Sequence, residues 1–176
     1  MTATTAFWIA LLLGMTATIL FLVVRVKKGG LPGVITKAGA SLLFIATACA
    51  ATARGGSDPA YGLLVVMGLV CGLLGDVWLD LKYVYTSDND TFLFAGFYSF
   101  FAGHLFFIAA IYLNYAWTPA TLAISAAVAL AGAAGSTLME KPMKLNYGRF
   151  RLTGFLYGFI LMMATSSSVV AAIVTR

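Results

Sequence analysis

The chain has 176 residues, of which 61% are hydrophobic and 10% are charged, and its mean hydropathy is +0.96. Soluble domains have ~45–50% apolar and ~25% charged residues, and a chain of this size has too little interior to bury so much apolar surface. This composition excludes a disordered chain, a disulfide-stabilised secreted domain and an ordinary cytosolic enzyme. It indicates an all-α, polytopic transmembrane helix bundle.

Six apolar runs are long enough to cross a bilayer, which takes about 20 residues per helix. We therefore predict one transmembrane helical domain over residues 1–176. The first run is too long for the apolar region of a secretory signal and has no basic residues before Phe7. We therefore expect it to be a transmembrane span. The predicted spans are, in chain order, Ala6–Val26, Gly33–Ala53, Ala60–Leu81, Thr91–Leu113, Pro119–Met139 and Leu152–Thr175.

The connections between these runs contain polar and helix-breaking residues. The first span ends in a basic stretch before Pro32, and Arg54–Pro59 is a polar turn. Asp90 or Thr91 is expected to cap the fourth span. The fifth span carries small residues that permit close helix approach, namely Ala129, Gly132, Ala133, Gly135 and Ser136.

The net charge of +5 is interpreted as a membrane-topology signal and not as a nucleic-acid-binding surface. Eight Lys and Arg side chains lie in the odd-numbered connections: Arg25, Lys27, Lys28, Lys82, Lys141, Lys144, Arg149 and Arg151. The other side has only Arg54 and Arg176. The odd connections should therefore face the cytoplasm and both termini should face outward, in a multi-pass protein of the cell or inner membrane. Cys49 and Cys71 are expected to be small buried residues.

Four ionisable residues fall inside the predicted spans, where charge is costly and therefore indicates function. They are Lys37, Asp76, Asp80 and His104, the only histidine. Asp76 and Asp80 share one helix face because they are four residues apart. We expect Lys37, Asp76 and His104 to line one cavity. For Lys37 the alternative is an interfacial position, and Asp80 is expected to lie nearer water, beside Lys82.

These residue types permit acid–base chemistry, because a carboxyl group in an apolar site can hold a proton near neutrality and an imidazole can activate water. The alternative is a metal ion held by the two Asp and the His, as Asp/His sets do in hydrolases, but we predict no bound metal and no cofactor. A zinc site normally has a second His or a Cys, and the sequence contains no GxSxG, HExxH or phosphate-binding glycine loop.

The stretch Gly68–Leu79, followed by Phe94, Gly96, Phe100 and His104, resembles the YhhN-type lysoplasmalogenase family, which includes the mammalian transmembrane-86 proteins. A Lys early in the second span, here Lys37, and a later Tyr followed by Met and Ala, here Tyr157 to Ala164, belong to the same pattern. The resemblance covers roughly Lys37 to Ala164. In this chain Ala38 replaces the usual Pro. The family usually has about two more spans with a Ser-Asp pair, so we expect either a shortened relative or a chain that is cut short.

The resemblance implies hydrolysis of the vinyl ether bond of lysoplasmalogen-like lipids to a fatty aldehyde and a glycerophospho-alcohol. It implies Asp76, His104 and Asp80 as catalytic candidates, and Lys37 and Tyr157 as contacts to a lysophospholipid substrate. Lys37 is expected to meet the lipid phosphate or to pair with Asp76. Two alternatives remain open: a small transporter with a proton relay, and a non-catalytic lipid-binding membrane subunit. A homo-oligomer is also compatible with the sequence.

Overall fold

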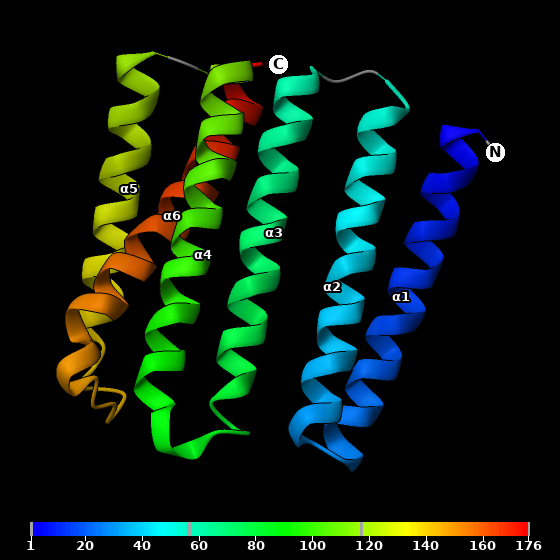
Figure 1. Ribbon diagram of the computed structural model, residues 1–176. Helices are drawn as coiled ribbons and strands as arrows, with labels where there is room; N and C mark the ends of the chain where they lie inside the picture. The colour runs from blue at the N-terminus through cyan, green and yellow to red at the C-terminus, as the bar shows by residue number, and fades with distance from the viewer. Residues whose placement is uncertain (1, 56–57, 117, 176) are drawn as a thin grey trace. The chain divides into compact units, whose positions relative to one another are not determined.

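The computed structural model (Figure 1) describes residues 2–55, 58–116 and 118–175, and within these ranges the fold is all-α with no strand. Among the residues that the structure describes, six helices are long and apolar enough to cross a membrane, which confirms the predicted fold class of a multi-pass membrane protein. Helices satisfy all their backbone hydrogen bonds internally, as a hydrocarbon environment requires. Their bounds are α1 Ala3–Lys27, α2 Gly30–Ala53, α3 Pro59–Leu81, α4 Asn89–Ile111, α5 Pro119–Leu138 and α6 Arg151–Val174.

Local sequence signals define several helix ends. Asp58 accepts a hydrogen bond from the Ala60 amide at 2.7 Å and caps α3, whose first residue is Pro59. Thr118 and Thr121 form a reciprocal capping box at the start of α5. The fourth helix begins at Asn89, one residue before the predicted cap, directly after a 3₁₀ turn over Thr86–Asp88.

The chain divides into two compact units, Met1–Gly103 and His104–Arg176, and each is described by itself. The predicted single domain over residues 1–176 stays a prediction. Arg176, one of the two basic residues expected on the outer side, and Gly56 and Ser57, in the predicted turn, lie outside the described residues.

In the first unit, α1, α2 and α3 lie side by side in alternating directions, and the connections after α1 and α3 are at the same end (Figure 1). This arrangement agrees with the prediction that these two connections share one side of the membrane. Cys49 is exposed and Cys71 is half-buried, so the predicted burial of Cys49 is wrong. A small apolar residue of a membrane helix is as acceptable toward lipid as toward protein.

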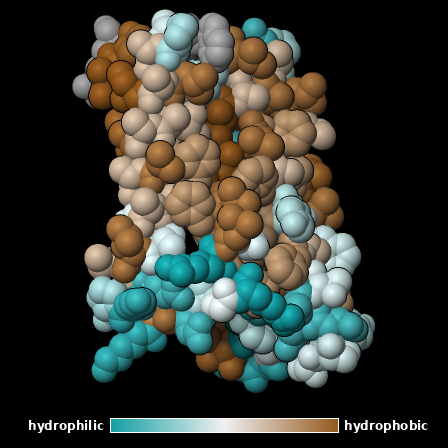
Figure 2. Space-filling model, turned by 90° about the vertical axis from the view of Figure 1, so that its left-hand side faces the viewer, coloured by the Kyte–Doolittle hydropathy of each residue, from teal (hydrophilic) through white to brown (hydrophobic). Residues whose placement is uncertain are grey.

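In the second unit, α5 packs on α6 through small residues. Ala129 and Ala133 are fully buried, and a Cβ on Gly132 would lie 3.1 Å from Met162. The predicted role of the fifth span in close packing is confirmed at these positions, whereas a Cβ on Gly135 would meet nothing within 4 Å. Seen from the side of α5 and α6, the surface is largely apolar, and hydrophilic residues gather at one end (Figure 2).

Candidate functional site: a charged network in the first unit

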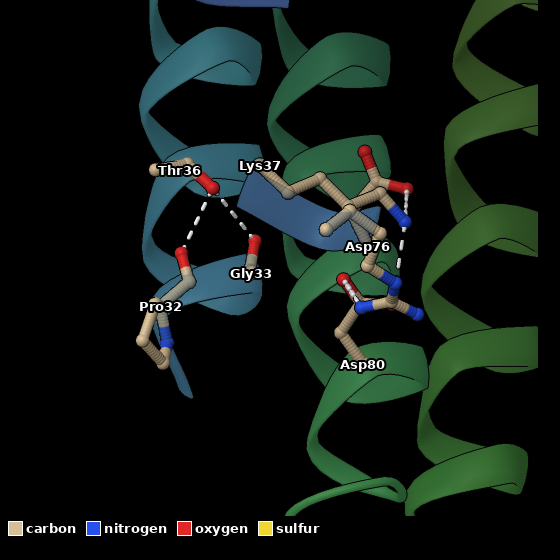
Figure 3. A network of polar contacts seen from close by, with 7 residues as sticks. Pro32, Gly33, Thr36, Lys37, Asp76 and Asp80 are labelled. Atoms are coloured by element: carbon tan, nitrogen blue, oxygen red, sulfur yellow. Dashed lines mark hydrogen bonds and ion pairs between the residues drawn. The ribbon is translucent and has the colours of Figure 1, made fainter. Parts of the chain in front are cut away.

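Lys37 on α2 reaches across to the two aspartates on α3 (Figure 3). Its Nζ lies 3.0 Å from Oδ1 of Asp76 and 3.7 Å from Oδ1 of Asp80. The aspartates are one helical turn apart, so both carboxylates face the same side of α3 and one ammonium group contacts both. Of the two alternatives for Lys37, the structure shows the pairing with Asp76, and a contact to a lipid phosphate stays a prediction.

Arg25 in the last turn of α1 completes the network. Its Nη1 donates to Oδ2 of Asp80 at 3.0 Å, and its guanidinium carbon lies 5.2 Å from the centre of the Tyr83 ring. Gly33 on α2 leaves room for this side chain, because a Cβ there would lie 3.4 Å from both Cδ and Nη1 of Arg25. Arg25 entered the sequence analysis only as a topology signal, so its place in the site was missed.

Burial separates the two carboxylates. The side chain of Asp80 is 5% exposed, whereas those of Asp76 and Lys37 are 26% and 25% exposed. The expectation that Asp80 lies nearer water, beside Lys82, is wrong: its partners Arg25 and Lys37 enclose it between α1, α2 and α3. Asp76 is thus the more accessible carboxylate of the pair.

Ser41 gives Asp76 a second partner, because its hydroxyl donates to Oδ2 at 3.1 Å. Ser41 follows Lys37 by one turn of α2, so the two side chains lie on the same helix face and hold one oxygen of Asp76 each. Ser41 was not among the predicted site residues, although its spacing from Lys37 is the signal that could have found it.

The network contains two cations and two carboxylates and is formally neutral. Ionisable groups inside a membrane protein are normally paired in this way, because an isolated charge in hydrocarbon is costly. Neutrality accounts for the presence of four charged side chains together, and within the network the side chains of Lys37 and Asp76 are partly exposed.

His104 and Tyr157 come together in the second unit. Their ring centroids are 6.0 Å apart with the planes at 82°, and Phe107 lies edge-on to His104 at 6.1 Å. These two candidate residues are therefore neighbours. A shared cavity of His104 with Lys37 and Asp76 stays a prediction. Within residues 2–55, 58–116 and 118–175, no group of three or more His, Cys, Asp or Glu side chains is arranged to hold a metal ion.

The glycines and aromatic residues of the Gly75–His104 pattern have a packing role in the first unit. A Cβ on Gly75 would lie 2.6 Å from the Phe100 ring, and one on Gly96 would lie 2.6 Å from Leu79. These glycines therefore let the first part of α4 approach α3 directly beside Asp76. The sequence pattern thus contains both Asp76 and the glycine contacts that hold α3 against α4 beside it.

The YhhN family model matches residues 33–175 of the sequence. The chain belongs to the YhhN family. No curated protein and no solved structure matches it in the corresponding searches. The matched region of this YhhN protein contains Lys37, Ser41, Asp76 and Asp80, as well as His104 and Tyr157. Arg25 precedes the match, and α1 nevertheless contributes it to the charged network.

Proposed function

We propose that this YhhN protein is an integral-membrane hydrolase that cleaves the vinyl ether bond of lysoplasmalogen-like lipids. The products are a fatty aldehyde and a glycerophospho-alcohol. Family membership and the resemblance of the Lys37, Gly75-Asp76 and His104 pattern to lysoplasmalogenases support the substrate class. The observation that carries the proposal is the partly exposed Lys37–Asp76 pair, with Nζ and Oδ1 3.0 Å apart.

The depth of this pair suits the proposed substrate. Asp76 precedes Leu81, the last residue of α3, by five positions, which corresponds to about 7.5 Å along the helix axis. The vinyl ether of a lysoplasmalogen is attached directly to the glycerol, so it also lies just below the headgroup. A lipid with its phosphate at the membrane surface therefore places the reacting bond near the level of Asp76.

Vinyl ether hydrolysis requires a proton donor, a water molecule and a negative charge. Protonation of the outer vinyl carbon gives an oxocarbenium ion. Water adds to the carbon bonded to oxygen and loses a proton. The resulting hemiacetal then breaks its C–O bond to the glycerol as its hydroxyl proton passes to the glycerol oxygen, which gives the aldehyde and the alcohol. The proton taken up in the first step is thus returned when water adds, and the net change is addition of one water.

The Lys37–Asp76 pair contains two of these elements. We assign the Lys37 ammonium as the donor of the proton to the vinyl carbon. The Asp76 carboxylate can stabilise the adjacent oxocarbenium ion, and it can accept the proton from the added water and return it to Lys37. We assign Asp76 to the reacting centre and Asp80, which is buried, to holding Lys37 and Arg25. We assign His104 to orienting water and Tyr157 to contacting the substrate, both as proposals.

The test is aldehyde release by the purified protein in detergent or reconstituted vesicles. A vinyl ether lysophospholipid is compared with the saturated alkyl ether of the same chain length, which has no carbon that can be protonated in this way. The proposal expects aldehyde from the vinyl ether only. Ion or solute flux without hydrolysis would favour a transporter, and lipid binding without turnover would favour a non-catalytic subunit.

A further inference from the structure

Arg25 lies outside the matched family region but contacts the most buried charge of the site. We propose that Arg25 is a positioning residue: by holding one oxygen of Asp80 it keeps the Lys37 ammonium on Asp76. This inference deepens the proposed function, and its activity measurement rests on that function. Its stability measurement does not.

The carboxylates of Asp76 and Asp80 both lie near the single ammonium group of Lys37 and both attract it. Lys37 Nζ lies 3.0 Å from Asp76 and 3.7 Å from Asp80, although Asp80 is the more buried group. Burial strengthens electrostatic attraction, so an Asp80 without another partner would draw Lys37 toward itself. Arg25 supplies that other partner at 3.0 Å.

The lysine stem makes this shift easy. Four methylene groups separate the ammonium from the backbone, so rotation within this flexible stem can shorten its distance to Asp80 at the expense of its contact with Asp76. If Lys37 moved, Asp76 would keep only the Ser41 hydroxyl at 3.1 Å. The proposed donor and carboxylate would then no longer be in contact.

The surroundings of Arg25 agree with a fixed position. Its guanidinium lies against Tyr83 on one side, and its chain passes over Gly33, which is buried. An arginine that served only as a topology signal would need neither contact, since the positive-inside effect depends on charge and not on geometry.

The first test is a charge-balanced rescue measured by aldehyde release. Arg25→Gln leaves Asp80 without its guanidinium partner. We expect kcat to fall by at least ~10-fold with a smaller change in KM, because displacement of a reacting group by about 1 Å can lower the rate by as much as 10²-fold. Arg25→Gln with Asp80→Asn removes one cation and one anion together and should recover most of kcat. Arg25→Lys should recover part of it. A double variant no more active than Arg25→Gln would overturn the proposal.

The second test needs no turnover. Thermal midpoints are measured for Lys37→Met, for Asp76→Asn and for the two combined. The part of the combined shift that is not the sum of the single shifts is the coupling between Lys37 and Asp76, and it is determined first with Arg25 present and then in the Arg25→Gln background. Loss of more than half of this coupling in the second background supports the proposal, and an unchanged coupling contradicts it. Absence of aldehyde release from every protein, including the unmodified one, would refute the proposed function while leaving this measurement decisive for Arg25.

A steric variant covers the case in which the charge variants fail to fold. Gly33→Leu keeps all four charges but occupies the space of the Arg25 side chain, whereas Gly39→Leu on the same helix adds the same group where nothing lies within 4 Å of a Cβ. Gly33→Leu should lower the coupling between Lys37 and Asp76 in thermal midpoint as Arg25→Gln does, and Gly39→Leu should leave it unchanged. Equal effects of the two variants would contradict a specific role for the position of Arg25.

Discussion

Asp76 and Asp80 are one helical turn apart on α3 but differ in burial and in partners. Asp76 is a quarter exposed and contacts Lys37 and Ser41, whereas Asp80 is enclosed by Lys37 and Arg25. In the proposed reaction the more exposed carboxylate meets the substrate, and the buried one holds the arrangement of charges. Two substitutions of the same type should therefore affect different properties of the protein.

Asp76→Asn should lower kcat for aldehyde release by at least ~10²-fold, which is the lower end for loss of a general acid–base group. The amide keeps the shape of the side chain but removes the charge next to Lys37. Lipid binding should change far less, because most of the affinity comes from apolar contact. Steady-state kinetics on folded, monodisperse protein checks this, and near-normal kcat would leave Asp76 with a structural role.

Asp80→Asn should mainly lower stability. It leaves the Arg25 guanidinium without its carboxylate, and the cost should be below the ~3–5 kcal/mol of a fully buried pair because Arg25 is about one-third exposed. Thermal unfolding in detergent measures the effect, with Asp88→Asn in the exposed connection after α3 as the control. Equal midpoints for the two variants would argue against a stabilising role of Asp80.

At the scale of helices, glycine contacts set the distance between α3 and the first part of α4. Gly75→Ala places a Cβ 2.6 Å from the Phe100 ring and should destabilise the protein by about 1–3 kcal/mol, the usual cost of overpacking. Gly72→Ala, one turn earlier, meets Phe100 only at 4.0 Å and serves as the matched control.

The same contact provides a rescue. Combining Gly75→Ala with Phe100→Leu should restore most of the thermal midpoint, because the smaller side chain vacates the space that the new methyl group needs. A double variant less stable than Gly75→Ala alone would show that Phe100 contributes by something other than this contact.

The helices could be predicted to within a few residues because run length and hydropathy define them in a membrane protein. The largest deviations are the starts of α1 and α2, each three residues earlier than predicted; α2 was placed at Gly33 after Pro32 but begins at Gly30. Proline was interpreted as a helix breaker, yet in the first turn its missing N–H has no intrahelical partner to lose.

The candidate site was only partly predictable. The four-residue spacing of Asp76 and Asp80 was sufficient to place them on one face. The role of Arg25 depends on which side of α1 packs on α2, and α1 is apolar all round, so its sequence does not distinguish a protein-facing side from a lipid-facing one. The burial of Asp80 follows from that packing and was missed for the same reason.

At the scale of the whole molecule, the basic connections predict topology. Those containing Lys27, Lys28, Lys141 and Lys144 should be cytoplasmic, with both termini outward. Single cysteines introduced in these connections, in a background lacking Cys49 and Cys71, should react with an impermeant maleimide only after the membrane is opened. Labelling from outside in intact cells would reverse the orientation.

The most direct test of vinyl ether hydrolysis is the isotopic composition of the aldehyde. In deuterium oxide, the purified protein should release an aldehyde, trapped as it forms, with one deuterium on the carbon next to the carbonyl, because that carbon takes its proton from an exchangeable donor. The alkyl ether analogue should give no aldehyde. Release of no aldehyde, or of aldehyde without deuterium at that carbon, would contradict hydrolysis by carbon protonation.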